Sequence, residues 1–192
     1  MPLSDDETRS TLKDARVAYL GMISPHYDEV FDEVAERVRK HGYATKLDLG
    51  GLVLWKRLQA NTRWASSLGA TADATVRDVT GRALSVYQDG ALSEVPAKAQ
   101  AARSVLAELP GFAHGDAFVS ALLTTFDGNN LAVFDRRANY ALGTVLKRPV
   151  RSGRGHYGRY IEEVHSLRAL VSEPNDIWTA RDIDTALYML GG

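Results

Sequence analysis

The fold is decided by the stretch Leu109-Pro110-Gly111-Phe112-Ala113-His114-Gly115-Asp116-Ala117. Proline presets φ and glycine accepts a positive φ, so Pro110 and Gly111 predict a sharp reversal between two helices. The small residues at 113, 115 and 117 predict a close approach of those helices. Backbone N–H groups at the start of the second helix have no partner within it, and they can bind a phosphate oxygen. An ordinary helix–helix corner is the alternative that this turn alone leaves open.

A single acid, Asp135, follows an apolar run two dozen residues beyond Gly111. Residues 131–134 form that run, and Arg136 and Arg137 come directly after the acid. The run is too short, and too isolated, to predict a paired strand. Because Asp135 opens a predicted helix, its side chain is also a candidate N-cap, and this role is compatible with a chemical one.

Helical periodicity dominates the rest of the chain, and no segment predicts a strand. Apolar residues recur at the spacing of one helix face, and the segments end at Gly, Asn or Asp turn signals. The expected helices span 27–40, 49–58, 63–68, 73–88, 97–109, 116–126, 135–145, 153–171 and 180–190. The sequence therefore predicts an all-α protein.

The composition excludes several kinds of chemistry. The 192 residues are 45% hydrophobic and 24% charged, as in ordinary globular proteins. The absence of cysteine excludes disulfides, a thiol nucleophile and a cysteine-ligated iron–sulfur cluster. The five histidines lack metal-ligand spacing, so we expect no metal and no catalytic zinc. No apolar run is long enough to span a membrane, and there is no signal peptide, so we expect a cytoplasmic protein.

Charge is distributed unevenly although the net charge is only −1. Residues 1–36 hold nine acids and three bases, whereas residues 147–159 hold bases and no acid. The basic residues of the second segment are Lys147, Arg148, Arg151, Arg154, His156 and Arg159. Such a segment favours a limited contact with a polyanion. A solvated flexible loop explains the same charges equally well.

Three features in order resemble the helix-hairpin-helix DNA glycosylase superfamily, which includes endonuclease III, the adenine glycosylases and the 8-oxoguanine glycosylases. They are the Val95-Pro96 helix start, the Leu109-Pro110-Gly111 turn and the segment Ala132-Val133-Phe134-Asp135. The resemblance implies an all-α, two-lobed helix-hairpin-helix DNA glycosylase-like fold with a central cleft. One lobe would comprise residues 48–134, and residues 1–47 plus 135–192 would form a discontinuous second lobe.

The resemblance also implies a catalytic role for Asp135. Cleavage of an N-glycosidic bond builds positive charge on the sugar, and a carboxylate can stabilise that charge or activate a water. Bifunctional members use a hairpin lysine as a Schiff-base nucleophile, and Gly115 occupies that position here. The chain therefore hydrolyses without a lyase step, takes a lysine from elsewhere, or has lost activity. Lys46 and Lys56 are the candidate donors, although a lysine on an apolar helix more often extends to the surface.

The DNA-binding residues implied by the resemblance are Gly111, Ala113, His114, Gly115, Asn61 and Arg136. Ala113 departs from the superfamily, which has a second glycine there. Asn61, or alternatively Gln59, would fill the gap that a flipped base leaves in the duplex. Helix N-capping is the other role that fits Asn61.

Asp184, Tyr188 and Trp55 are the residues expected to form a pocket for the extruded base. Asp184 and Tyr188 share one helix face at i, i+4 spacing, where an acid can accept purine N–H groups and an aromatic ring can stack. Burial in the core is the alternative for both aromatic residues. We expect a monomer that needs no cofactor and acts on double-stranded DNA containing a modified base, with an oxidised purine as the first candidate. A catalytically silent DNA-binding protein and a helical interaction module are the alternatives.

Overall fold

The computed structural model describes residues 3–192, and its regular elements within that range are all helical. The elements are α1 (Asp5–Met22), α2 (Glu29–His41), α3 (Lys46–Trp55), α4 (Arg63–Ala70), α5 (Asp73–Gln88), α6 (Val95–Leu106), α7 (Ala117–Phe126), α8 (Arg136–Tyr140), the π-helical turn η1 (Ala141–Val145), α9 (His156–Val171) and α10 (Ala180–Leu190). The prediction of an all-α protein is confirmed.

Helix α1 is the element that the sequence analysis missed. Ser4 and Glu7 form a capping box at its start, in which each side chain binds the other residue's backbone N–H. Leu12 and Tyr19 are buried on its inner face. Its outer face carries exposed apolar residues such as Val17 and Leu20, and these obscure the helical pattern.

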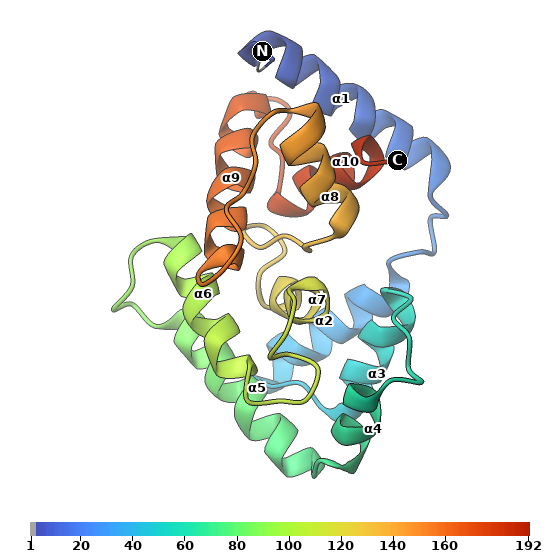
Figure 1. Ribbon diagram of the computed structural model, residues 1–192, viewed down its shortest axis with the longest axis vertical. Coiled ribbons are helices and arrows are strands. Elements are labelled where there is room, and N and C mark those ends of the chain that lie inside the picture. The colour runs from blue at the N-terminus through green and yellow to red at the C-terminus, as the bar shows by residue number, and fades with distance from the viewer. Residues whose placement is uncertain (1–2) are drawn as a thin grey trace.

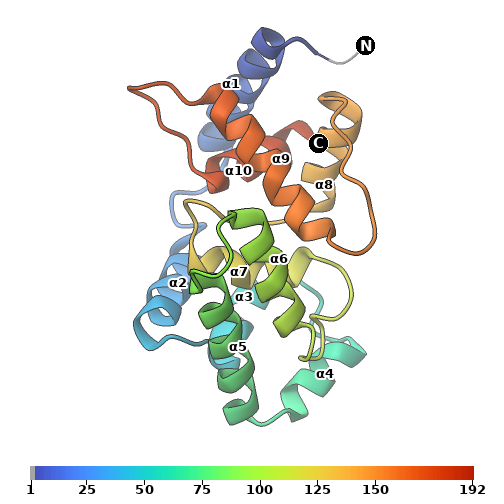
Figure 2. The same ribbon diagram turned by 90° about the vertical axis from the view of Figure 1, so that its left-hand side faces the viewer.

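The helices gather towards two ends of the molecule around one continuous core. Figure 1 shows α1, α8, α9 and α10 together at one end and α2, α3, α4 and α5 at the other, and Figure 2 shows the same grouping from the side. Helix α6 packs against both α5 and α9, and so it joins the two groups. Each of the helices α1 to α10 contributes buried apolar side chains to a single cluster.

The position of α2 corrects the expected division of the chain. That division places residues 1–47 in the lobe that also contains 135–192. Helix α2 instead packs against α3 and α7, because its apolar stripe, which includes Phe31, Val34 and Val38, is buried there. Within residues 1–47, helix α1 is the element that packs closely with α9 and α10.

The turn between α6 and α7 is longer than predicted, because α6 ends at Leu106 and α7 begins at Ala117. Gly111 has a φ of 91°, and a Cβ at this position would overlap the indole of Trp64. Gly115 also has a positive φ, of 75°, but a Cβ there would meet nothing within 4 Å. The expectation of close helix contact at residue 115 is therefore wrong, since a glycine is needed there for the backbone conformation alone.

Residues 131–134 form an extended segment that is buried without a partner strand. Its backbone groups bind side chains instead: the Val133 N–H donates to Asp184 Oδ2 at 2.7 Å, and the Phe134 N–H donates to Ser120 Oγ at 2.8 Å. The hydroxyls of Tyr157 and Tyr160 donate to the carbonyls of Ala132 and Val133 at 3.0 and 3.1 Å. Because buried backbone groups need partners, these bonds hold the segment in place. Asp135 follows it directly in the chain, so its position is fixed as well.

Candidate functional site

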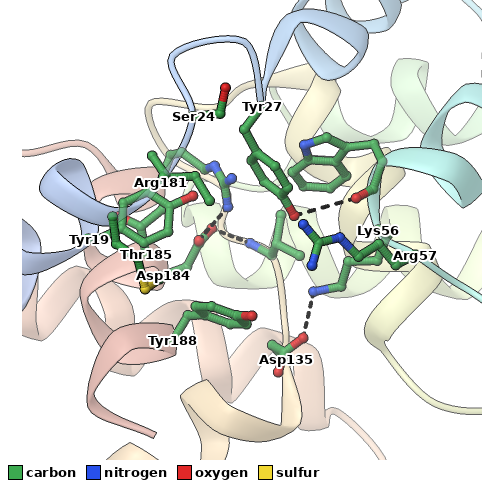
Figure 3. A pocket seen from close by; sticks show the side chains of 14 residues that line it. Tyr19, Ser24, Tyr27, Lys56, Arg57, Asp135, Arg181, Asp184, Thr185 and Tyr188 are labelled. Atoms are coloured by element: carbon green, nitrogen blue, oxygen red, sulfur yellow. Dashed lines mark hydrogen bonds and ion pairs between the residues drawn. The ribbon is translucent and has the colours of Figure 1, made fainter. Parts of the chain in front are cut away.

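A cavity of about 310 Å³ opens beside Asp135 and is drawn in Figure 3. Its walls come from the end of α1 and the loop that follows it, from the end of α3, from the extended segment before α8, and from α10. The lining residues are Tyr19, Met22, Ile23, Ser24, Tyr27, Trp55, Lys56, Arg57, Val133, Asp135, Arg181, Asp184, Thr185 and Tyr188. The cavity lies at the lower end of the size range of small-molecule sites, roughly 300–1,000 Å³.

An ion pair between Lys56 and Asp135 lies at the wall of this cavity. Lys56 Nζ donates to Asp135 Oδ2 at 2.8 Å, and the Lys56 side chain is only 12% exposed. Figure 3 shows the two side chains pointing towards each other from α3 and from the start of α8. The expectation that Lys56 extends to the surface is therefore wrong. The second candidate, Lys46, lies elsewhere, because its Nζ donates to the carbonyls of Gly69 and Thr71.

The early end of α3 places Lys56 at the cavity. The sequence predicted a helix through Leu58, whereas α3 ends at Trp55. Arg57 adopts a φ of 55°, which turns the chain out of the helix. Lys56 and Arg57 therefore both line the cavity.

The Asp135 carboxylate is held in its ionised form. Burial opposes ionisation, but the hydrogen bond and charge of Lys56, together with the Arg137 backbone N–H, outweigh it and lower the pKa of Asp135 below its usual value. The N–H of Arg137 donates to Asp135 Oδ1 at 2.9 Å, so Asp135 is the N-cap of α8 as predicted. A carboxylate fixed by two donors at a cavity wall can stabilise a neighbouring positive charge.

The expected base-binding role of Asp184 does not fit its contacts. Asp184 is 3% exposed, and its two oxygens accept hydrogen bonds from the Val133 N–H and, at 2.5 Å, from Arg181 Nη1. Burial raises the pKa of the Asp184 carboxyl to about 6. Both oxygens already have donors within the protein. Asp184 holds the guanidinium of Arg181 in place, and Arg181 lines the cavity.

Arg181 contacts acids on two elements and an aromatic ring. Its Nη2 lies 3.3 Å from Asp28 Oδ1, and its guanidinium carbon lies 5.2 Å from the centre of the Trp55 ring. Burial opposes its charge, but Asp184 and Asp28 outweigh this and raise the pKa of Arg181. The cavity therefore contains a fixed cationic hydrogen-bond donor.

The predicted aromatic residues Trp55 and Tyr188 both line the cavity. Trp55 is buried, packs against Phe31 with ring centres 4.7 Å apart, and donates its Nε1 hydrogen to Asp28 Oδ1 at 2.8 Å. Tyr188 is half-buried, and its hydroxyl accepts a hydrogen bond from Arg137 Nη1 at 3.1 Å. Trp55 is thus a core residue that reaches the cavity, whereas Tyr188 is a half-buried residue that forms part of the cavity wall.

The structure places the expected DNA-binding residues outside this cavity. Ala113, His114 and Gly115 are exposed on the turn between α6 and α7, and Arg136 is exposed at the start of α8. Asn61 is exposed in the loop before α4. Capping is not its role, because the N-cap of α4 is Thr62, whose hydroxyl accepts from the Ala65 N–H at 3.4 Å.

A second cavity, of about 450 Å³, joins this turn to the basic segment. Gly115 and Asp116 line it from the turn, residues 152–155 line it from the loop before α9, and His156 and Tyr157 line it from the start of α9. Asp116 is buried and accepts hydrogen bonds from Arg103 Nε at 3.1 Å and from His156 Nδ1 at 2.6 Å. Arg159 donates to carbonyls of its own loop, whereas Arg154 is exposed and lines this cavity together with Gly115.

No family model, curated protein or solved structure matches the chain. None of the helices described in residues 3–192 has the length and apolar character needed to cross a membrane. In the same range, His, Asp and Glu side chains form no group of three that could hold a metal ion.

The residues of the cavity beside Asp135 that sequence reasoning missed include Tyr19, Tyr27, Arg57 and Arg181. Tyr19 was missed together with α1. Tyr27 and Arg57 lie at the ends of the expected helices 27–40 and 49–58, which the structure shortens, and neither residue was recognised as part of a site. Arg181 could have been found, since it precedes Asp184 by three residues on a predicted helix and i, i+3 pairs of opposite charge share a face.

Proposed function

We propose that the protein is a DNA glycosylase-like enzyme with a two-lobed helix-hairpin-helix fold, which flips a modified base into the Asp135 cavity and hydrolyses its N-glycosidic bond. The observation that carries the proposal is Asp135 itself. Its carboxylate lies at the wall of a small cavity, beside aromatic rings, with a lowered pKa. The resemblance of residues 95–135 to the superfamily supports the same role.

The cavity has the features that an extruded nucleobase needs. Tyr27 and Tyr188 offer ring faces or edges at its walls, and such surfaces stack on bases. Loss of the base leaves positive charge on the sugar, and the ionised Asp135 would stabilise that charge or orient the attacking water. The N-cap bond from Arg137 would hold the carboxylate in place during this step.

Arg181 indicates which edge of the base would be recognised. An arginine has five N–H donors, and the ion pairs to Asp28 and Asp184 use two of them. A base with hydrogen-bond acceptors on its inner edge would fit this donor. An oxidised purine with an added carbonyl oxygen meets that requirement, and Arg181, not Asp184, would be the residue that reads it.

The exposed turn at residues 113–115 would anchor the DNA backbone. Its backbone N–H groups and Arg154, which lines the second cavity together with Gly115, suit phosphate oxygens. Arg136 would add a contact close to the cavity. Such contacts carry no sequence information, as expected for an enzyme that searches duplex DNA for a modified base.

The proposal is tested with a panel of duplexes, each of which contains one modified base. After the reaction, heat and alkali cleave the strand at any abasic site. Strand cleavage at the modified position of at least one duplex is the expected result. Salt-dependent DNA binding without release of any base would instead establish the catalytically silent DNA-binding protein. Absence of DNA binding would leave only the helical interaction module.

A further inference from the structure

We propose that Lys56 is an amine nucleophile at this site, and that the protein cleaves abasic DNA through a Schiff base formed on α3 and not on the turn. This inference rests on the proposed function, because it uses the same cavity and the same extruded sugar. It adds a strand-cleaving activity to base hydrolysis. It also assigns the amine to a part of the chain where the superfamily resemblance does not place one.

The position of Lys56 carries the inference. Among the residues described, it is the lysine that lines the cavity. Its Nζ is 2.8 Å from Asp135 Oδ2, and its side chain is 12% exposed. An extruded sugar positioned for Asp135 would therefore lie within reach of the amine as well. Partial desolvation is one of the ways in which a protein makes a lysine nucleophilic, and the bond to Asp135 fixes the position of the amine at the cavity wall.

The other lysines lack this placement. Lys46 is bonded to the carbonyls of Gly69 and Thr71, and Lys13 pairs with Glu173 on the surface. Gly115 offers no amine at the position used by bifunctional glycosylases. If the chain forms a Schiff base, Lys56 is the residue that the geometry selects.

The reaction balances without a co-reactant. The Lys56 ammonium first loses a proton, for which Asp135 is the adjacent acceptor and water the final one. The free amine adds to C1′ of the ring-opened abasic sugar, and water leaves as the C=N bond forms. Loss of a C2′ proton then breaks the bond between C3′ and the phosphate oxygen. Hydrolysis of the imine consumes one water, which balances the water lost earlier, and frees the Lys56 amine, leaving an unsaturated aldehyde on one strand end and a 5′-phosphate on the other.

The test uses a duplex with a single abasic site, so that the identity of the excised base does not matter. The full-length protein is incubated with this duplex and sodium borohydride, which reduces an imine to a stable cross-link. Lys56→Arg keeps the positive charge beside Asp135 and has no nucleophilic amine, and Lys56→Met removes both. Lys40→Arg, at an exposed position near the end of α2, is the matched control. Circular dichroism and DNA affinity establish that each variant is folded.

We expect a cross-link with the wild type and with Lys40→Arg, mapped by peptide mass to Lys56, and its loss in both Lys56 variants. A cross-link mapped to the N-terminal amine or to another lysine would overturn the proposal. Release of a modified base by a wild-type protein that forms no cross-link would also overturn it, while leaving the proposed glycosylase function intact. Cross-linking without base release would support Lys56 and count against that function.

Discussion

The Asp184 carboxylate accepts a hydrogen bond from the Val133 N–H at 2.7 Å, and so it ties α10 to the extended segment that ends at Asp135. Its other oxygen binds Arg181. One buried acid thus positions both the backbone that leads to the proposed catalytic carboxylate and the cation that faces the cavity. The stability of this arrangement and the geometry of the site should therefore change together.

Substitution Asp184→Ala should strongly destabilise the protein. It leaves the buried Arg181 guanidinium without its closest acid and the Val133 N–H without an acceptor, and breaking a buried pair in this way costs about 3–5 kcal/mol. Urea denaturation followed by circular dichroism measures the free energy of unfolding. The control is Asp6→Ala, which removes an acid that is 92% exposed in its pair with Arg9 and should leave stability nearly unchanged. Equal stability of the two variants would contradict the assigned role of Asp184.

Two glycine substitutions in one turn should differ in cost. At Gly111 an alanine meets both the positive φ and the Trp64 indole, whereas at Gly115 it meets only the positive φ. Gly115→Ala should cost about 1–2 kcal/mol from the left-handed conformation, and Gly111→Ala clearly more. Thermal unfolding of both variants checks this order, and adding Trp64→Leu should recover part of the Gly111→Ala loss. The reverse order would mean that Trp64 does not pack on Gly111.

Asp116 should make the protein sensitive to acid. Burial opposes its ionisation, but His156 and Arg103 outweigh this and hold the pKa of Asp116 below its unfolded value of 3.8. The unfolded chain then binds the proton more tightly than the folded protein. The stabilisation is present above pH 3.8 and is lost as the pH falls through the folded pKa.

The measurement for Asp116 compares urea denaturation of the wild type and of Asp116→Asn across this acidic range. The difference in unfolding free energy between the two proteins should shrink as the pH falls, because asparagine does not titrate. If the difference in unfolding free energy stays constant, protonation of Asp116 does not affect stability.

Arg136 should contribute to DNA affinity without contributing to base preference. It is exposed at the start of α8, beside the proposed catalytic acid. Loss of one phosphate contact reduces the slope of log affinity against log salt by about 1. Fluorescence anisotropy with Arg136→Ala at several salt concentrations measures this slope, and Lys40→Ala on α2 is the control. An unchanged slope in Arg136→Ala would remove this residue from the DNA surface.

Several elements could be predicted from the sequence because local signals determine them. The ranges 73–88 and 180–190 are confirmed as α5 and α10. Asp89-Gly90 follows the first of these helices, and Thr179 begins a capping box at the second. The N-cap role of Asp135 followed in the same way from its place before a helical pattern.

The contents of the cavity could not be predicted, because they depend on contacts between distant segments. The direction of Lys56 follows from the positive φ of Arg57, which no propensity for arginine indicates. One oxygen of Asp184 accepts a hydrogen bond from the Val133 N–H, and Val133 lies 51 residues away in the chain. Asp184 and Lys56 were each recognised as candidates from sequence, but what each one touches required the fold.

Base release by Asp135→Asn measures what the Asp135 charge contributes to cleavage of the glycosidic bond. Asparagine retains the volume and the N-capping ability of Asp135 but lacks the negative charge. On the duplex that the wild type cleaves, single-turnover release of the base should fall by about 10²–10⁴-fold, the range typical of a positioned acid–base group, while DNA affinity stays the same. Release of the base by Asp135→Asn at the wild-type rate would show that the Asp135 charge has no role in the reaction.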